Sequence, residues 1–450
     1  MQFNKDVFST SSKMENGELL ISGCKATSLA KEYGTPLFVL DEPDLRARIT
    51  RWKSSLERHF GSNAGTVYYA AKSFISVEVA KIIAELGIGI DVCTGGEMAV
   101  AMAAKFPAER MELHGNNKSP AEISDAINQG IGRIVIDSLQ EIDRVQEIAK
   151  AAGVNQKVLI RITPGVEAHT HESISTAHED IKFGLSIASG AAWKAIEKVE
   201  ACSNLTLQGL HCHIGSQIFT TEGHSLAIAR ILELMGKFRD HTNRELVEFD
   251  IGGGFGIAYI DGEVTLDPDE ALSKLAKVVK EECAKNKLTH PKISIEPGRA
   301  IIGPTTTTLY EVGTTKNIEL DGGKNRHYIS VDGGMSDNLR PGLYGAKYMA
   351  ILANRTSKEN EIDSRIVGKH CETGDIVVRD IQMPSDVKPG DLLAIPATGA
   401  YGRSMANNYN HMTKPAVVAV SNGKARLILR RETHADLLAL DVSESLRELS

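Results

Sequence analysis

LVEFDIGGG (246–254) has the form of a short buried β-strand that ends in a glycine-rich turn, and it is one of eight such runs. The others are VYYAA (67–71), GIGIDVC (87–93), RMELHGN (110–116), RIVIDS (133–138), KVLIRITP (157–164), LQGLHCHIG (207–215) and KISIEPG (292–298). Amphipathic segments that predict helices separate them, among them 76–87, 119–130 and 267–287. This alternation predicts a (β/α)8 TIM-type barrel, because one barrel uses all eight units without a remainder. A doubly wound sheet stays open as the alternative, since the count does not prove that the sheet closes.

After Gly298 the pattern changes to strand-like runs with turns between them. They are 305–315, 326–334, 365–380, 391–397 and 415–433, and the last holds the hairpin signal Ser421-Asn422-Gly423. These runs predict a C-terminal β domain, sandwich-like or barrel-like. The early runs GELLIS (17–22) and PLFVLD (36–41) are expected to pair with it. We therefore expect an N-terminal segment 1–45 that joins the β domain, a barrel over 46–302 and the β domain over 303–450.

Composition narrows the class of protein. The 450 residues carry a net charge of −7, which argues against a broad basic surface for nucleic acid but not against a local site for a small anion. The six cysteines form no C-x-x-C pair, so neither a zinc ribbon nor a thioredoxin motif is indicated. No signal peptide and no membrane-spanning apolar run is recognisable. We expect a reduced, cytoplasmic protein that binds neither nucleic acid nor membrane.

Unusual side chains fall at the C-terminal ends of the predicted strands, where TIM-type barrels carry their active sites. Lys72 ends the first run; by itself it could be a solvent-facing lysine, but a desolvated amine suits Schiff-base chemistry. His211 and His213 end the sixth run and face the same way on a strand. Zinc ligation, a histidine above a cofactor ring and a core histidine are all open for this pair.

The last two strand ends add groups that could hold an anion and a cation. The glycines of DIGGGFG (250–256) could offer N–H groups to an anion or could simply form a tight turn. Glu296 and Arg299 could be a surface ion pair, or a carboxylate for a cationic ring nitrogen and a guanidinium for a phosphate. A lysine, a histidine, a glycine loop and a carboxylate at strand ends together are what pyridoxal phosphate requires.

Seven ordered motifs resemble those of the diaminopimelate decarboxylases, in the alanine-racemase-like (fold type III) class of pyridoxal-phosphate enzymes. They are AAKSF, HCHIGSQ, DIGGGFG, EPGRA, SDNLRPGLYGA, HCETGD and ATGAYGRSMANNYN. The resemblance runs from about Tyr33 to the C-terminus. It implies a carboxy-lyase that converts meso-2,6-diaminopimelate to L-lysine and carbon dioxide, the last step of lysine biosynthesis.

The resemblance also implies roles for individual residues. Lys72 would be covalently attached to the cofactor, and His213 would stack on its ring. The residues expected around the cofactor are Lys72, His213, Ser216, Gly254, Glu296, Gly298, Arg299 and Tyr401. Those expected around the substrate are Arg299, Arg340, Tyr344, Glu372 and Tyr401. Cys371 would return a proton to Cα, and no metal is expected.

In the family that the motifs indicate, Cys371 and Glu372 would come from a second subunit, so a homodimer with shared active sites is implied. Three alternatives stay open: a decarboxylase of ornithine, arginine or carboxynorspermidine, a zinc hydrolase that uses His211 and His213, and a silent binding protein. The stretch 169–184 is expected to be an active-site loop that enters a helix.

Overall fold

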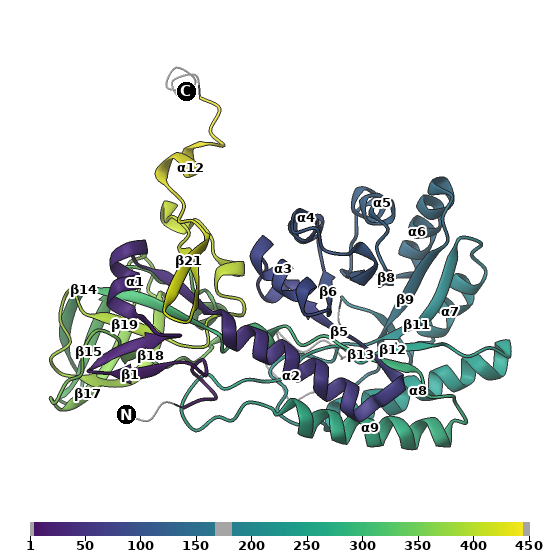
Figure 1. Ribbon diagram of the computed structural model, residues 1–450, viewed down its shortest axis with the longest axis horizontal. Helices are drawn as coiled ribbons and strands as arrows, with labels where there is room; N and C mark the ends of the chain where they lie inside the picture. Colours follow the sequence, from purple (N-terminus) through teal and green to yellow (C-terminus); the bar gives the residue numbers. More distant parts are fainter. Residues whose placement is uncertain (1–3, 167–181, 444–450) are drawn as a thin grey trace. The chain divides into compact units, whose positions relative to one another are not determined.

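The protein is described from a computed structural model covering residues 4–166 and 182–443. The chain forms two compact units (Figure 1). The barrel unit comprises Arg46–Ile257 and Thr265–Ile301, and the β unit comprises Met1–Leu45, Ala258–Val264 and Ile302–Ser450. Most of the predicted active-site loop, 169–181, lies outside the described residues. None of the helices among the described residues combines the length and apolar character that crossing a membrane requires.

Eight parallel strands close the barrel, so the predicted (β/α)8 fold is confirmed and the doubly wound sheet is excluded. In chain order they are β5 (Ala64–Ala70), β6 (Gly89–Val92), β7 (Met111–Leu113), β8 (Arg133–Ile136), β9 (Gln156–Thr163), β11 (Leu205–His211), β12 (Glu248–Asp250) and β13 (Lys292–Ile295). Each strand pairs with the next, and β13 pairs in parallel with β5 to close the ring. A further two-residue strand, β10 (Leu185–Ser186), pairs with β9.

Helix α2 (Glu42–Phe60) precedes the first barrel strand, and each barrel strand is followed by a helix (Figure 1). The helices that follow are α3 (Val77–Glu85), α4 (Gly95–Ala103), α5 (Pro120–Gln129), α6 (Leu139–Ala152), α7 (Ala191–Glu200), α8 (Glu222–Thr242), α9 (Pro268–Lys285) and the short α10 (Arg299–Ile302). The sequence explains their ends: Ser119 and Glu122 form a capping box before α5, and Gly130 ends that helix in the left-handed conformation. The predicted helix boundaries at these residues are confirmed.

The β unit contains two sheets. The small one has the order β1 (Lys13–Glu15), β2 (Glu18–Ile21) and β3 (Cys24–Lys25), and α1 (Ala26–Tyr33) follows it. The large one has the order β18 (Ile376–Pro384), β17 (Glu361–Val367), β15 (Lys324–Val331), β14 (Thr306–Leu320), β4 (Leu37–Asp41), β20 (Ala416–Ser421) and β21 (Lys424–Leu429). Two more strands join this sheet: β19 (Leu392–Ile395) pairs with β14, and β16 (Ile351–Leu352) pairs with β19. The helices of the unit that remain are α11 (Arg340–Tyr344) and α12 (His434–Leu438).

The N-terminal segment joins the β domain, as the sequence predicts. Strand β4 lies between β14 and β20 in the large sheet and pairs with both. The hairpin between β20 and β21 turns at Asn422 and Gly423, both with positive φ, as a two-residue turn of this kind requires. The short stretch 258–264 also belongs to the β unit, although the sequence pattern does not separate it from the barrel. The predicted domain boundaries stay predictions.

Candidate active site

Lys72 lies directly after the first barrel strand, in the one-turn helix η2 (Ala71–Ser73). The hydroxyl of Ser73 donates a hydrogen bond to the carbonyl of Ala70 at 2.7 Å, which fixes this turn. A Cβ added at Gly298 would lie 2.7 Å from the Cβ of Ala70, so glycine lets the loop after β13 approach the lysine turn closely. The fold therefore brings two of the predicted cofactor segments together.

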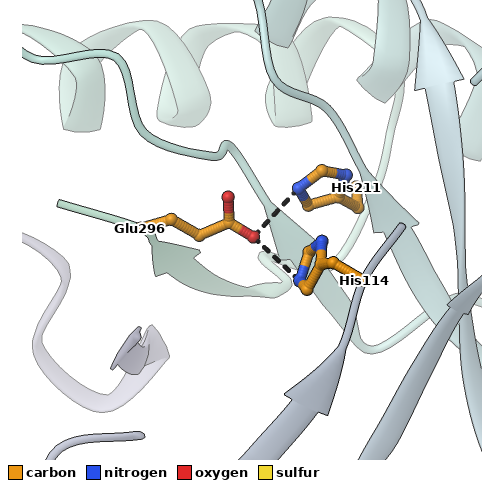
Figure 2. A group of neighbouring side chains, drawn as sticks. All are labelled: His114, His211 and Glu296. Carbon is orange, nitrogen blue, oxygen red and sulfur yellow. Dashed lines mark ion pairs between the residues drawn. The ribbon is translucent and has the colours of Figure 1, made fainter. Parts of the chain in front are cut away.

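Glu296 follows β13 and is buried inside the barrel, with 4% of its surface exposed. Its Oε1 lies 3.0 Å from Nε2 of His211, at the end of β11, and 3.1 Å from Nε2 of His114, which follows β7 (Figure 2). The two imidazole rings meet edge to face, with centroids 4.9 Å apart. The other carboxylate oxygen points away from both rings, and Oε2 lies 4.0 Å from Nδ1 of His213. One carboxylate thus meets three barrel histidines.

Three further carboxyl groups are buried in the barrel near Glu296: Asp91, Glu112 and Asp250. Burial and then the negative charge of Glu296 raise the pKa of Asp91 and of Asp250 well above the usual range. Burial raises the pKa of Glu112 to about 8. Burial also opposes ionisation of Glu296, but His211, His114 and Lys72 outweigh it and hold the pKa of Glu296 well below its usual range. Glu296 is therefore the carboxyl group that stays ionised.

The glycine turn after β12 packs against neighbouring strand-end loops. A Cβ at Gly253 would lie 2.3 Å from the carbonyl oxygen of Glu296, and one at Gly254 would lie 2.4 Å from that of Gly215. The backbone N–H of Gly253 donates a hydrogen bond to Nδ1 of His213 at 3.2 Å. Close backbone packing therefore requires these glycines whether or not they also face an anion.

Ser216 and Arg299 form a second contact between the loops after β11 and β13. Nη2 of Arg299 donates a hydrogen bond to the hydroxyl oxygen of Ser216 at 2.9 Å. A guanidinium and a hydroxyl side by side suit a phosphate or carboxylate group. The structure thus joins two residues that the sequence predicts beside the cofactor.

Arg340 is buried in the β unit, at the start of α11. Its Nη1 donates a hydrogen bond to the hydroxyl of Tyr348, and its guanidinium lies over the ring of Tyr259, 4.5 Å from the centroid. Burial disfavours the charge, but Tyr259, Tyr348 and Tyr401 outweigh this and raise the pKa of Arg340. Its buried Nε has no hydrogen-bond partner among the described residues. Arg340 is thus a permanent cation with a spare donor.

Two other predicted residues lie near Arg340. Tyr344 is half-buried at the end of α11. Tyr401 has φ of 59°, a left-handed conformation that a tyrosine rarely adopts and that often marks a functional position.

Cys371 and Glu372 are exposed on a loop of the β unit that buried groups hold in place. The carboxylate of Asp375 accepts hydrogen bonds from the backbone N–H of His370 at 2.8 Å and of Met335 at 2.7 Å. The ring of His370 contacts the hydroxyl of Ser336 at 2.8 Å. The fold therefore presents a thiol and a carboxylate on a loop that these hydrogen bonds anchor.

The pair His211 and His213 does not form a metal-binding arrangement within the part of the chain that the structure describes. The groups whose ligand atoms converge are His114, His211 and Glu296, and Glu112, Asp250 and Glu296. His213 belongs to neither.

Comparison with known proteins identifies the family. Residues 42–303 match the model of the pyridoxal-dependent decarboxylase pyridoxal-binding domain. The chain is 52% identical over 432 residues to the diaminopimelate decarboxylase of Mycobacterium tuberculosis, covering 95% of this chain and 96% of that protein. This chain belongs to the diaminopimelate decarboxylase family. Its relative in Bacillus subtilis is 45% identical, over 96% of this chain and 97% of the relative.

A solved structure agrees with this diaminopimelate decarboxylase family assignment. The M. jannaschii diaminopimelate decarboxylase, determined with L-lysine, has a TM-score of 0.89 and 31% identity over 97% of this chain and 99% of that one. The family consists of carboxy-lyases that depend on pyridoxal phosphate, so neither the zinc hydrolase nor the silent binding protein is needed to explain the chain.

The buried groups of the barrel fit pyridoxal phosphate. Glu296 Oε1 and the Nε2 atoms of His114 and His211 are buried, and each Nε2 lies within 3.1 Å of Oε1 at ion-pair distance, but none of the three atoms has a hydrogen bond of standard geometry within the described chain. They form a polar centre at the strand ends. The amine of Lys72 is close enough to influence Glu296 and His213 electrostatically. An amine, an imidazole and an ionised carboxylate are the groups that this cofactor needs.

Sequence reasoning missed four buried groups of the barrel: Asp91, Glu112, His114 and Arg161. His114 ends the third run and could have been found by the same strand-end rule that found Glu296. Arg161 lies within the apolar strand β9, and its guanidinium is 4.6 Å from the ring centroid of Phe183. A charged residue inside an otherwise apolar barrel strand is the signal that indicates an inward-facing role.

Proposed function

We propose that this chain decarboxylates meso-2,6-diaminopimelate to L-lysine and carbon dioxide. Membership of the diaminopimelate decarboxylase family supports the reaction. The observation that carries the chemistry is the buried carboxylate of Glu296, which lies within 3.1 Å of two histidine nitrogens and whose pKa these histidines and Lys72 hold well below the usual range. When bound, pyridoxal phosphate supplies an electron-accepting ring for the electron pair left on Cα when carbon dioxide departs.

In this proposal the barrel unit holds the cofactor. Lys72 attaches it covalently, and His213 stacks against its ring. Glu296 keeps a proton on the ring nitrogen, for which an ionised carboxylate is required. Ser216, Gly254, Gly298 and Arg299 surround the phosphate side, and the hydrogen bond between Arg299 and Ser216 supports their acting together. Tyr401 is proposed as a further cofactor contact.

The β unit binds the end of the substrate that does not react. Arg340 grips the distal carboxylate, because its spare Nε can complete a bidentate contact. Glu372 binds the distal ammonium, and Tyr344, Tyr401 and Arg299 complete the site. Cys371 donates the proton that Cα needs after carbon dioxide leaves.

Carbon dioxide release from meso-diaminopimelate, with and without added pyridoxal phosphate, tests the reaction. We expect release that depends on the cofactor and that is lost in Lys72→Ala. A Lys72→Ala protein that releases carbon dioxide at the normal rate refutes the proposal. The rival substrates are ornithine, arginine and carboxynorspermidine, and kcat/KM for each decides between them. Use of ornithine as efficient as that of diaminopimelate would favour the rival, because ornithine offers Arg340 no distal carboxylate.

We also propose a homodimer in which Cys371 and Glu372 of one subunit complete the site of the other. Both residues are exposed on their loop, which supports a contact outside their own chain. Mixing two inactive variants, Lys72→Ala and Cys371→Ala, tests this. Random exchange of subunits should restore about a quarter of the wild-type activity, because half of the dimers then hold one intact site. No recovery after proven exchange contradicts shared sites.

A cytoplasmic location is also proposed, because all six cysteines are free thiols, as is usual in a reducing compartment. Cell fractionation, with antibodies against the chain, measures where the protein is found. Recovery of the protein in a secreted fraction would refute the proposal.

A further inference from the structure

We propose that His114 and His211 are positioning residues that hold Oε1 of Glu296 and so keep the opposite oxygen, Oε2, directed as an anion toward the ring nitrogen of the cofactor. This inference rests on the proposed function, because it assumes that Glu296 faces that nitrogen. Neither histidine would touch the cofactor itself. Their role would be to set the charge and orientation of the carboxylate that does.

The two carboxylate oxygens of Glu296 have different neighbours. Oε1 is engaged from two directions, by histidines that come from the separate strands β7 and β11 (Figure 2). Oε2 points away from these rings (Figure 2). It lies 4.0 Å from Nδ1 of His213, the residue proposed to stack on the cofactor. A carboxylate held at one oxygen retains the lone pairs of the other for a second partner.

The protonation of the histidines agrees with this division. Burial lowers the pKa of His114 and of His211, and the negative charge of Glu296 opposes this shift in both rings. A neutral imidazole has one N–H, and the nearby carboxylate favours the tautomer that carries it on Nε2. A ring that carries a proton on Nε2, whether neutral or charged, directs it toward Oε1 at 3.0 to 3.1 Å and so favours the anion. A neutral donor stabilises the anion without replacing the ring nitrogen as its ionic partner.

The surroundings explain why Glu296 needs such support. The charged and titratable groups that face this region of the barrel are Lys72, Asp91, Cys93, Glu112, His114, Arg161, His211, Cys212, His213 and Asp250. Three of them are carboxyl groups that burial holds protonated. Without the two histidine donors, Glu296 would be a fourth buried carboxyl in the same environment. The histidines therefore select which acid carries the charge.

The test compares pyridoxal phosphate with 1-deaza-pyridoxal phosphate, in which carbon replaces the ring nitrogen. The full-length chain, freed of cofactor, is titrated with each compound, and the two dissociation constants are measured from the absorbance of the bound form. We expect His114→Leu and His211→Leu each to reduce the preference for pyridoxal phosphate over the analogue about tenfold, since a hydrogen bond to a charged group is lost. The analogue itself should bind the variants and the wild type alike.

Two further variants separate positioning from a general loss of structure. His327→Leu removes another buried histidine, one in β15 that contacts Asn317, and should leave the preference unchanged. In a Glu296→Gln background, His114→Leu should cause no additional loss of preference, because the carboxylate through which it acts is gone.

An unchanged preference in both leucine variants overturns the inference, and so does a loss that persists undiminished in the Glu296→Gln background. If a leucine variant does not fold, the asparagine variant replaces it, because asparagine keeps a polar group in the buried site but is too short to reach Oε1. The asparagine variant should show the same tenfold fall, to about a tenth, in the preference for pyridoxal phosphate over the analogue. An unchanged preference again overturns the inference. A wild-type chain that binds neither compound refutes the proposed function instead.

Discussion

Replacing Arg340 by lysine separates the shape of this side chain from its charge. The guanidinium is fixed by a hydrogen bond to Tyr348 and by the ring of Tyr259 at 4.5 Å, and its Nε has no partner within the described chain. Lysine keeps the positive charge but cannot form two parallel hydrogen bonds with a carboxylate. We expect a loss of about 2 kcal/mol in binding, or roughly thirtyfold in kcat/KM for diaminopimelate.

Two inhibitors show whether that loss comes from the distal carboxylate. L-Lysine, the proposed product, retains this carboxylate, whereas cadaverine lacks it and is otherwise the same chain. The inhibition constant of L-lysine should rise about thirtyfold in Arg340→Lys, and that of cadaverine should stay nearly constant. The ratio of the two constants is therefore the quantity to measure.

Arg355→Lys is a matched control in the same unit. Arg355 bridges Asp386 and Asp391 at 2.8 Å each and has no proposed role at the site, so the variant should alter thermal stability but not the ratio. A normal ratio in Arg340→Lys, with both proteins folded, refutes the role assigned to Arg340.

Three other variants test the site and its scaffold. Cys371→Ala should lower kcat by about two to four orders of magnitude in steady-state assays, with little change in KM or thermal stability, because the thiol is exposed and is proposed as the proton donor. Gly253→Ala should weaken cofactor retention and lower the free energy of unfolding by about 1–3 kcal/mol, since the new Cβ would lie 2.3 Å from the carbonyl oxygen of Glu296. Burial raises the pKa of folded Asp337 to about 7, from 3.8, so the unfolded chain loses this proton first and stability should fall as pH rises between about 4 and 7. Asp337→Asn should reduce this fall in urea denaturation, and an identical pH dependence in both proteins would contradict it.

The barrel was predictable because its signals are local. Each strand is a short apolar run, and residues such as Ser119 and Gly130 mark where the next helix begins and ends. The short strands β7 and β12 were predicted too long, because HGN and GGG continue the run in sequence but turn out of the sheet in the structure. The place of 258–264 in the β unit could not be predicted, since it depends on contacts with residues distant in sequence, such as that of Tyr259 with Arg340.

The candidate site was predictable only in part. Lys72, His213 and Glu296 stand at strand ends, where the barrel rule directs attention, and the structure brings them together. His114 stands at such an end as well, yet nothing in its local sequence indicates that its ring meets His211 inside the barrel. Convergence of that kind depends on the closure of the sheet and not on any spacing along the chain.

The four buried acids of the barrel also show that the sequence alone does not reveal which side chains meet inside the barrel. All four acids lie in or just after parallel strands: Asp91, Glu112, Asp250 and Glu296. Their positions in the sequence therefore do not predict which of them is ionised. Burial alone would protonate every one of them. Of these four acids, only Glu296 has two imidazole nitrogens within 3.1 Å of one oxygen. Its lower pKa therefore comes from its neighbours and not from the type of acid. A barrel that kept Glu296 but lost His114 and His211 would therefore retain the EPGRA motif while losing the contacts that favour the charge on its carboxylate.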